Sequence, residues 1–232
     1  MRVRLSLMTV MCVLVIVSIL GAAITPAAAH SIGSVGADFE PPTYLQQRNL
    51  SCEYASLVIA FSTYGVSVSE YEFDDLVGWS DNPHLGFRGD INGNWGNTTD
   101  YGVYAEALVQ PVSHFGFRGV AFYGQGDATQ LKRYLDNRVP VLVWLGFWGD
   151  QSHIEYGSDG TPFKLNEGNH VVVAYGYDDS GVFISDPATG IASSIAWGDF
   201  IPMWNVLGGM GLATWPVVAA KQPEVKQPGI CC

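Results

Sequence analysis

Positive charge is scarce in this sequence. Its 232 residues include 11 lysines and arginines against 22 aspartates and glutamates, which gives a formal net charge of −11. A surface this acidic repels phosphate backbones, which argues against nucleic acid as a partner. The chain also has no internal repeat, which argues against a repeat-built adhesion domain, and after residue 29 it has no apolar run long enough to span a membrane.

Cysteine is scarce as well. Cys12 lies in the N-terminal apolar segment, Cys231 and Cys232 end the sequence, and Cys52 stands alone in the predicted globular part. An exported domain held by disulfides would carry an even, dispersed set of cysteines. Cys52 therefore has no obvious structural partner, and a disulfide with the tail is the alternative.

Residues 1–29 have the features of a signal peptide. Arg2 and Arg4 precede an apolar run over 5–24, and small residues end at Ala29. This pattern predicts cleavage after Ala29, although a run of about 20 apolar residues also has the length of an uncleaved anchor. We expect a secreted or cell-envelope protein that contacts the membrane only if this segment stays as an anchor.

The remaining chain is predicted to form one α+β domain over 42–215, with N-terminal helices packed on a mainly antiparallel sheet, because helices come first and strands later. The Pro-rich, polar tail over 219–232 is predicted to be disordered. Helices are expected over 52–65, 69–78, 101–114, 127–138 and 197–206, and strands over 119–124, 139–148, 170–177, 181–187 and 211–215. Two helix starts carry capping signals: Asp127 as an N-cap, and a capping box of either Ser67 with Glu70 or Ser69 with Glu72.

A long polar segment over 78–102 is rich in Gly, Asn and Asp, and loops of this length are usually functional. We expect it to form one wall of a cleft, with Phe87 and Trp95 as apolar contacts. A calcium loop starting at Asp90 is disfavoured, because Trp95 stands where the glycine is required and Tyr101 where the glutamate is required. No metal is expected.

Cys52 at the start of a buried helix is the candidate nucleophile. The attacking species is the thiolate, and the positive end of a helix and a nearby imidazolium both lower a thiol pKa. His170 begins a buried strand after a polar loop, where its ring can face a cleft, and Asp186 ends the partner strand, where a carboxylate can fix the imidazole tautomer. His84 or His153 would take the base role if His170 were buried.

The hairpin register decides whether His170 and Asp186 can meet. With a four-residue loop over 178–181, Tyr177 pairs with Val182, and His170 and Asp186 lie on opposite faces of the sheet. A loop of three or five residues places them on the same face, because a slip of one residue flips every side chain. The pattern permits the pair without requiring it.

Attack on an amide creates an oxyanion, which needs hydrogen-bond donors. The backbone N–H of Cys52 is one candidate. A side-chain amide just upstream is another, and either Gln46 or Gln47 can supply it.

Gln46, Cys52, His170 and Asp186, in this order and spacing, resemble the papain-like cysteine peptidases. More narrowly, the chain is similar to the free-standing branch of the bacteriocin-processing, double-glycine peptidase-like group, family thirty-nine of the cysteine peptidases. The similarity covers about residues 42–205 and rests on these segments: CEYASLVIAFSTYGV, NPHLGFRGDINGNWG, YGVYAEAL, RVPVLVWLGFW and NHVVVAYGYDDSGVFISDPATG.

The resemblance implies a papain-like fold and cleavage of peptide or protein substrates through a thioester, without a metal or organic cofactor. In it Cys52 is the nucleophile, His170 the base and acid, Asp186 the orienting residue and Gln46 the oxyanion donor. An acyl-transferring transpeptidase on the same triad and a non-catalytic peptide-binding module are the alternatives.

Two departures from the leader-processing members argue against a double-glycine leader as the substrate. Glu53-Tyr54 replaces the Gly-Pro that usually follows their cysteine, and the transporter fused to them is absent from this sequence.

Overall fold

A computed structural model of the protein describes residues 41–217. The predicted signal peptide and the predicted tail over 219–232 lie outside the described residues. The helices are α1 (Cys52–Ser62), η1 (Glu70–Phe73, a 3₁₀ helix), α2 (Asp74–Val77), α3 (Ala105–His114), α4 (Thr129–Asp136) and α5 (Trp197–Asn205). The strands are β1 (Phe117–Tyr123), β2 (Val141–Gly146), β3 (Ser152–Tyr156), β4 (Pro162–Asn166), β5 (Asn169–Tyr177), β6 (Gly181–Asp186), β7 (Ile191–Ala196) and β8 (Met210–Pro216). Between residues 41 and 217, none of the helices has the length and apolar character needed to cross a bilayer.

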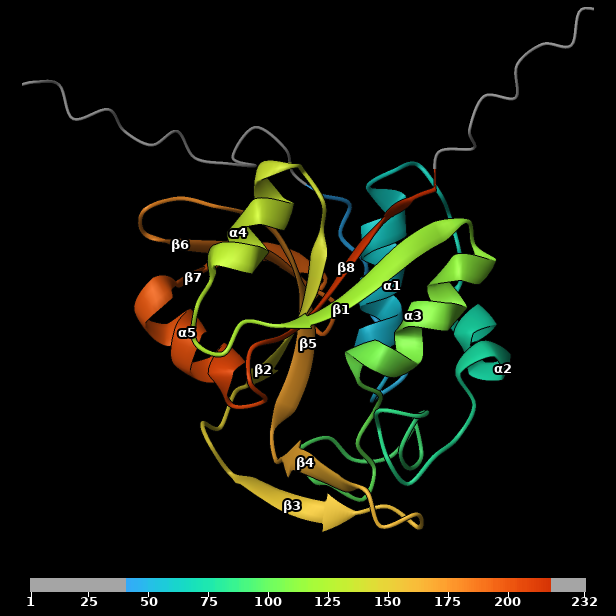
Figure 1. Cartoon of the computed structure of the whole chain (residues 1–232). Coiled ribbons are helices and arrows are strands. Elements are labelled where there is room, and N and C mark those ends of the chain that lie inside the picture. Colours follow the sequence, from blue (N-terminus) through green and yellow to red (C-terminus); the bar gives the residue numbers. More distant parts are fainter. Residues whose placement is uncertain (1–40, 218–232) are drawn as a thin grey trace, which may run out of the picture. The chain divides into compact units, whose positions relative to one another are not determined.

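Six strands form one sheet in the order β1-β8-β2-β5-β6-β7, and every neighbouring pair in it is antiparallel. Helices cover both faces: α1 and α3 lie on one side, and α4 and α5 on the other (Figure 1). The predicted α+β class with a mainly antiparallel sheet is therefore confirmed. The strands β3 and β4 form a separate two-stranded hairpin.

Burial on both faces explains why the central strands are apolar without interruption. All six residues of β2 are buried. Leu142 and Trp144 belong to the core under α1 and α3, whereas Val141 and Val143 belong to the core under α4 and α5. A strand covered on both sides reads as a continuous apolar run, as this one does.

The sequence missed β7 and the β3–β4 hairpin. In β7 the majority of side chains are exposed, and the hairpin lies within a stretch that reads as a polar loop, although Phe163 and Leu165 of β4 pack in the core. Two helices start later than expected, α3 at Ala105 and α4 at Thr129, with Ala128 rather than Asp127 as the N-cap of α4. The helices α1 and α5 begin at the expected residues, Cys52 and Trp197. Of the two capping boxes considered, the structure has Ser69 with Glu72.

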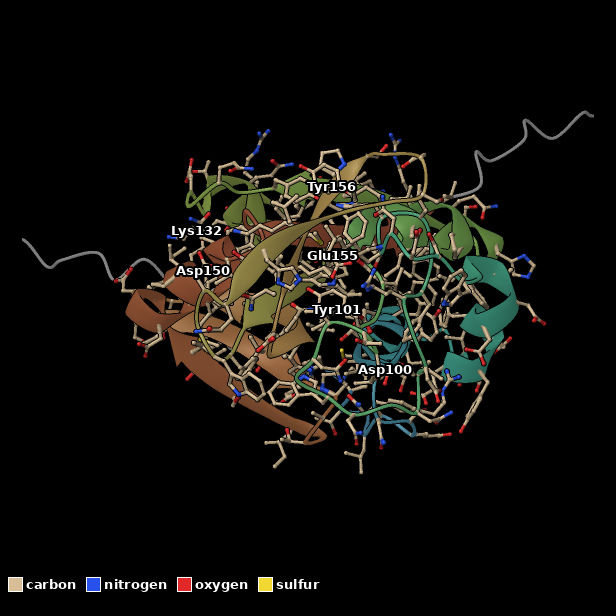
Figure 2. All side chains as sticks on the ribbon, turned by 90° about the horizontal axis from the view of Figure 1, so that it is seen from below. Asp100, Tyr101, Lys132, Asp150, Glu155 and Tyr156 are labelled. Carbon is tan, nitrogen blue, oxygen red and sulfur yellow. The ribbon has the colours of Figure 1, made fainter. Side chains whose placement is uncertain are left out.

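The long polar segment over 78–102 is an ordered loop that meets the β3–β4 hairpin. Figure 2 looks onto this face, with Asp100 and Tyr101 at the end of the loop and Glu155 and Tyr156 on the hairpin. Arg88 joins the two, since its guanidinium lies 2.8 Å from the Glu155 carboxylate and donates to the Thr98 carbonyl at 2.7 Å. Phe87 packs in the core, so its predicted place in a cleft wall is wrong.

Candidate active site

Cys52 is the first residue of α1 and is 6% exposed, with its thiol free. The loop before it is held by the buried carboxylate of Glu70, which accepts from the Gln47 N–H, the Arg48 side chain and the Ser51 hydroxyl. The Ser51 hydroxyl therefore donates to this network, and the Ser51 side chain does not cap the helix. The thiol sits at the positive end of an 11-residue helix.

The surroundings of the thiol oppose its ionisation in the ligand-free protein. Burial, and after it the charge of Glu53, raise the pKa of Cys52 well above its ordinary value. The N–H groups of Val171 and Glu53 act in the lowering direction. The sequence predicted a lowered pKa from the helix end and a nearby imidazolium, and it missed the effect of a buried carboxylate beside the sulfur.

His170 and Asp186 form the hydrogen bond that the sequence left open, with 2.7 Å between Nε2 and Oδ1. The hairpin loop has four residues, because Tyr177 pairs with Val182. A β-bulge at Tyr175 then shifts the register, so that Ala174 pairs with residue 184. Because a bulge inserts one unpaired residue, it brings His170 and Asp186 to the same face.

Asp186 is held as an ionised carboxylate. Burial alone would raise its pKa, but hydrogen bonds from His170 and from the Ala188 N–H, together with the charge of His170, lower the pKa below its ordinary value. The Phe147 ring also meets the His170 ring edge-on, with 5.5 Å between the ring centroids. Asp186 and Phe147 thus both contact the imidazole.

The predicted site residues line one cavity of about 320 Å³. Its walls are Gln46, Asn49, Cys52, Trp95, Phe147, His170, Asp186 and Ala188. His170 is buried yet borders this cavity, whereas His84 pairs with Glu106 and His153 with Glu155. Neither alternative histidine lines it.

Gln46 rather than Gln47 reaches this cavity. Its Nε2 donates to the carbonyls of Arg48 and Asn49 at 2.8 and 2.9 Å, and its Oε1 is buried without a partner. The Gln46 backbone N–H donates to the Pro187 carbonyl at 2.9 Å, which ties it to the residue after Asp186. In this conformation both side-chain N–H groups serve the backbone.

Trp95 supplies the apolar wall that the sequence expected from the long loop. Its Nε1 donates to the Asn169 carbonyl at 2.7 Å, and its ring meets Trp148 edge-on at 5.0 Å. A second cavity of about 330 Å³ shares Gln46, Asn49, Trp95 and Ala188 with the first. Two cavities therefore adjoin around the same residues.

The family model for the Peptidase_C39 like family matches residues 40–212. The chain belongs to this family. Its fold is similar to that of a C39-like peptidase from Bacillus anthracis, with a TM-score of 0.62 and 21% identity over 77% of this chain and 96% of the other. It is also similar to a double glycine motif protease from an AMS/PCAT transporter, solved in complex with the leader peptide, with a TM-score of 0.50 and 19% identity over 77% of this chain and 93% of the other. Among curated proteins, no sequence matches.

The Peptidase_C39 like family and the shared fold support a cysteine peptidase, and they bear out the recognised resemblance. A larger cavity of about 620 Å³ lies among Tyr64, Arg133, Tyr134, Arg138 and Trp215, away from Cys52 and His170. It contains no candidate nucleophile, so chemistry rather than size identifies the site. Within residues 41–217, no three His, Cys, Asp or Glu side chains form a group able to hold a metal ion.

Sequence reasoning missed four residues at this site: Asn49, Phe147 and Ala188, which line the cavity, and Glu53 beside the thiol. Glu53 had a detectable signal, because a carboxylate inside a helix that is apolar all round must be buried, and buried carboxylates are rare without a specific partner. Asn49 and Phe147 lie in connecting segments, where no periodicity marks a residue that faces a cavity.

Proposed function

We propose that this chain is an exported cysteine peptidase that hydrolyses peptide or related amide bonds through Cys52, His170 and Asp186. The observation that carries the proposal is the 2.7 Å hydrogen bond from His170 to Asp186 in the cavity that also holds the Cys52 thiol. This bond occupies Nε2 of the imidazole and leaves Nδ1 to exchange a proton with the thiol.

The reaction begins when the Cys52 thiol transfers its proton to His170 and the sulfur bonds to the substrate carbonyl carbon. The carbonyl electrons move to oxygen, where the Cys52 N–H donates, joined by Gln46 once its side chain turns from the backbone carbonyls. Collapse of this intermediate breaks the C–N bond, and His170 protonates the leaving amine. Water, deprotonated by His170, then hydrolyses the thioester and restores the thiol.

A peptide is the proposed substrate, for two reasons. The related double glycine motif protease was solved with a leader peptide bound. In the present chain, two adjoining cavities of about 320 and 330 Å³ share one wall, which suits an extended chain better than a compact ligand. Trp95 borders both cavities and offers an apolar surface next to the thiol.

Export is proposed from residues 1–29, whose charge and apolar pattern are those of a signal peptide. Fractionation of producing cells and N-terminal sequencing of the exported protein test it. A new N-terminus at His30 supports cleavage, an intact N-terminus in the membrane fraction supports an anchor, and an intact protein that stays in the cytoplasm contradicts export.

The test of the active site is the rate at which iodoacetamide alkylates Cys52 as a function of pH, in the wild type and in His170→Ala. Mass spectrometry of the peptide that contains Cys52 keeps the tail cysteines out of the measurement. Because proton transfer to His170 would offset the effect of burial on the thiol, we expect alkylation well below the usual thiol pKa of about 8.5 in the wild type and its loss in the variant. Equal profiles in both proteins would refute the Cys-His pair and leave a peptide-binding module.

Substrate and reaction type follow from digestion of a peptide library, with Cys52→Ala as the matched control. Cleaved products that form only with the wild type indicate a peptidase. Addition of an amine acceptor separates hydrolysis from acyl transfer, because a transpeptidase then gives the acceptor-linked product.

A further inference from the structure

Glu53 places a fully buried carboxylate against the nucleophile. It is 1% exposed, and its Oε2 lies 3.4 Å from the Cys52 sulfur, positioned to accept the thiol hydrogen. A carboxylate is costly to bury, and it is retained where it has a specific partner. The partner here is the atom that must lose a proton for the reaction to start.

The backbone at residues 102 and 103 lies directly against this carboxylate. Its other oxygen, Oε1, accepts from the Val103 N–H at 3.0 Å. Gly102 has a φ of +124°, and a side chain at that position would collide with the Glu53 carboxylate. The segment before α3 therefore approaches α1 closely because a glycine leaves room for the charge.

We propose that Glu53 is a positioning residue that holds Cys52 as a thiol while Glu53 is ionised and permits the thiolate when Glu53 is protonated. This inference rests on the proposed cysteine peptidase function. It goes beyond the triad, because it makes nucleophile activation depend on a fourth titrating group.

The protons balance in both states. With Glu53 ionised, the thiol S–H donates to Oε2, and transfer of that proton to His170 would leave two negative charges about 3.4 Å apart. With Glu53 protonated, the proton of Cys52 passes to His170, and the Glu53 O–H donates to the thiolate. The hydrogen bond between them reverses direction, and the thiolate gains a donor in place of a like charge.

Glu53 titrates near neutral pH, whereas the titratable side chains that its charge affects do not. Burial raises the pKa of Glu53 to about 7. The titratable side chains that its charge affects come from α1 and from the segment before α3: Cys52, Tyr54, Tyr101 and Tyr104. Burial raises the pKa of each of the four, first among the causes, so each stays neutral while Glu53 ionises.

The test compares the pH profile of Cys52 alkylation in the wild type, Glu53→Gln, Glu106→Gln and His170→Ala. Gln keeps an acceptor for Val103 but removes the charge. We expect the wild-type rate to fall as the pH rises through about 7, and Glu53→Gln to react about tenfold faster than the wild type at about pH 8, since each pKa unit is a factor of ten in thiolate. Glu106→Gln, the matched control outside the cavity, should follow the wild type.

The outcomes separate this inference from the proposed function. A Glu53→Gln variant that reacts more slowly would make Glu53 a proton acceptor, and an unchanged profile would make it structural; either result overturns the inference. If His170→Ala leaves the profile unchanged, the proposed function fails as well.

A measurement on the wild type alone covers the case in which Glu53→Gln does not fold. The infrared band of a protonated carboxyl group should disappear with the same pH midpoint as the fall in Cys52 alkylation. Two different midpoints would overturn the inference.

Discussion

The free energy of unfolding should depend on pH through Glu53, and replacement of this residue by Gln should remove that dependence. The pKa of the carboxyl is 4.5 when exposed and about 7 in the folded protein, because burial disfavours its charged form. The folded state therefore binds this proton more tightly than the unfolded chain. The stability is fully present below the unfolded pKa and is lost as the pH rises through the folded pKa.

The magnitude follows from the pKa difference. At about 1.4 kcal/mol for each pKa unit, a difference of about 2.5 amounts to about 3 kcal/mol. Urea unfolding of the wild type and of Glu53→Gln at about pH 4 and about pH 8 measures it. Every other titrating group is common to the two proteins, so the change in their difference isolates Glu53.

We expect the free energy of unfolding of Glu53→Gln to rise by about 3 kcal/mol relative to that of the wild type when the pH goes from about 4 to about 8. The control is Glu106→Gln, for which the sign reverses. Burial alone would raise the pKa of Glu106, but hydrogen bonds from His84 and Tyr123 lower it, so that carboxylate contributes stability above its ordinary pKa, which the variant loses. A difference between wild type and Glu53→Gln that is equal at both pH values would refute the reasoning.

Three further substitutions test the frame of the site. Asp186→Asn should lower kcat/KM on a cleaved peptide by about a hundredfold or more, because the amide no longer stabilises the His170 imidazolium; a loss below about threefold would contradict the triad. Glu70→Gln should lower the free energy of unfolding in urea by about 1 to 3 kcal/mol, since the buried network loses its charged acceptor and the Arg48 guanidinium keeps only its ion pair with Asp74. An unchanged midpoint would show the network to be dispensable. Gly102→Ala should cost at least about 1 to 3 kcal/mol in the same assay, because its φ of +124° disfavours a side chain and an added methyl group would collide with the Glu53 carboxylate. A neutral result would mean that the backbone relaxes there.

The sequence predicted the elements with long apolar runs and missed short strands that bury few side chains. The run ending at Phe61 and the run starting at Val141 are core elements in the structure, and both read as such because packing demands apolar residues on every side. The strands β7 and β3 are mainly exposed, and β4 is short and adds only Phe163 and Leu165 to the core, so no long periodic pattern marks these strands. Where few side chains of a strand are buried, the sequence carries little signal of pairing.

For the site, the sequence supplied residue types and order, but the geometry depends on backbone irregularities. Cys52, His170, Asp186 and Gln46 line one cavity, whereas their catalytic roles stay predictions. The bulge that aligns His170 with Asp186 had a signal in Gly176, since a glycine inside a strand often marks a bulge. The direction of the Gln46 amide had none, because it depends on carbonyl groups that only the folded loop brings together.

Because of the bulge at Tyr175, the number of residues between His170 and Asp186 decides whether their side chains share a face of the sheet. Side chains alternate along a strand, so loss or gain of one residue in this segment moves the imidazole and the carboxylate to opposite faces, whereas a change of two residues restores them. Point substitutions in the hairpin leave that count unchanged. The length of this short stretch, more than its composition, therefore constrains how the gene can vary, and single-codon deletions there should be the least tolerated changes outside the cavity itself.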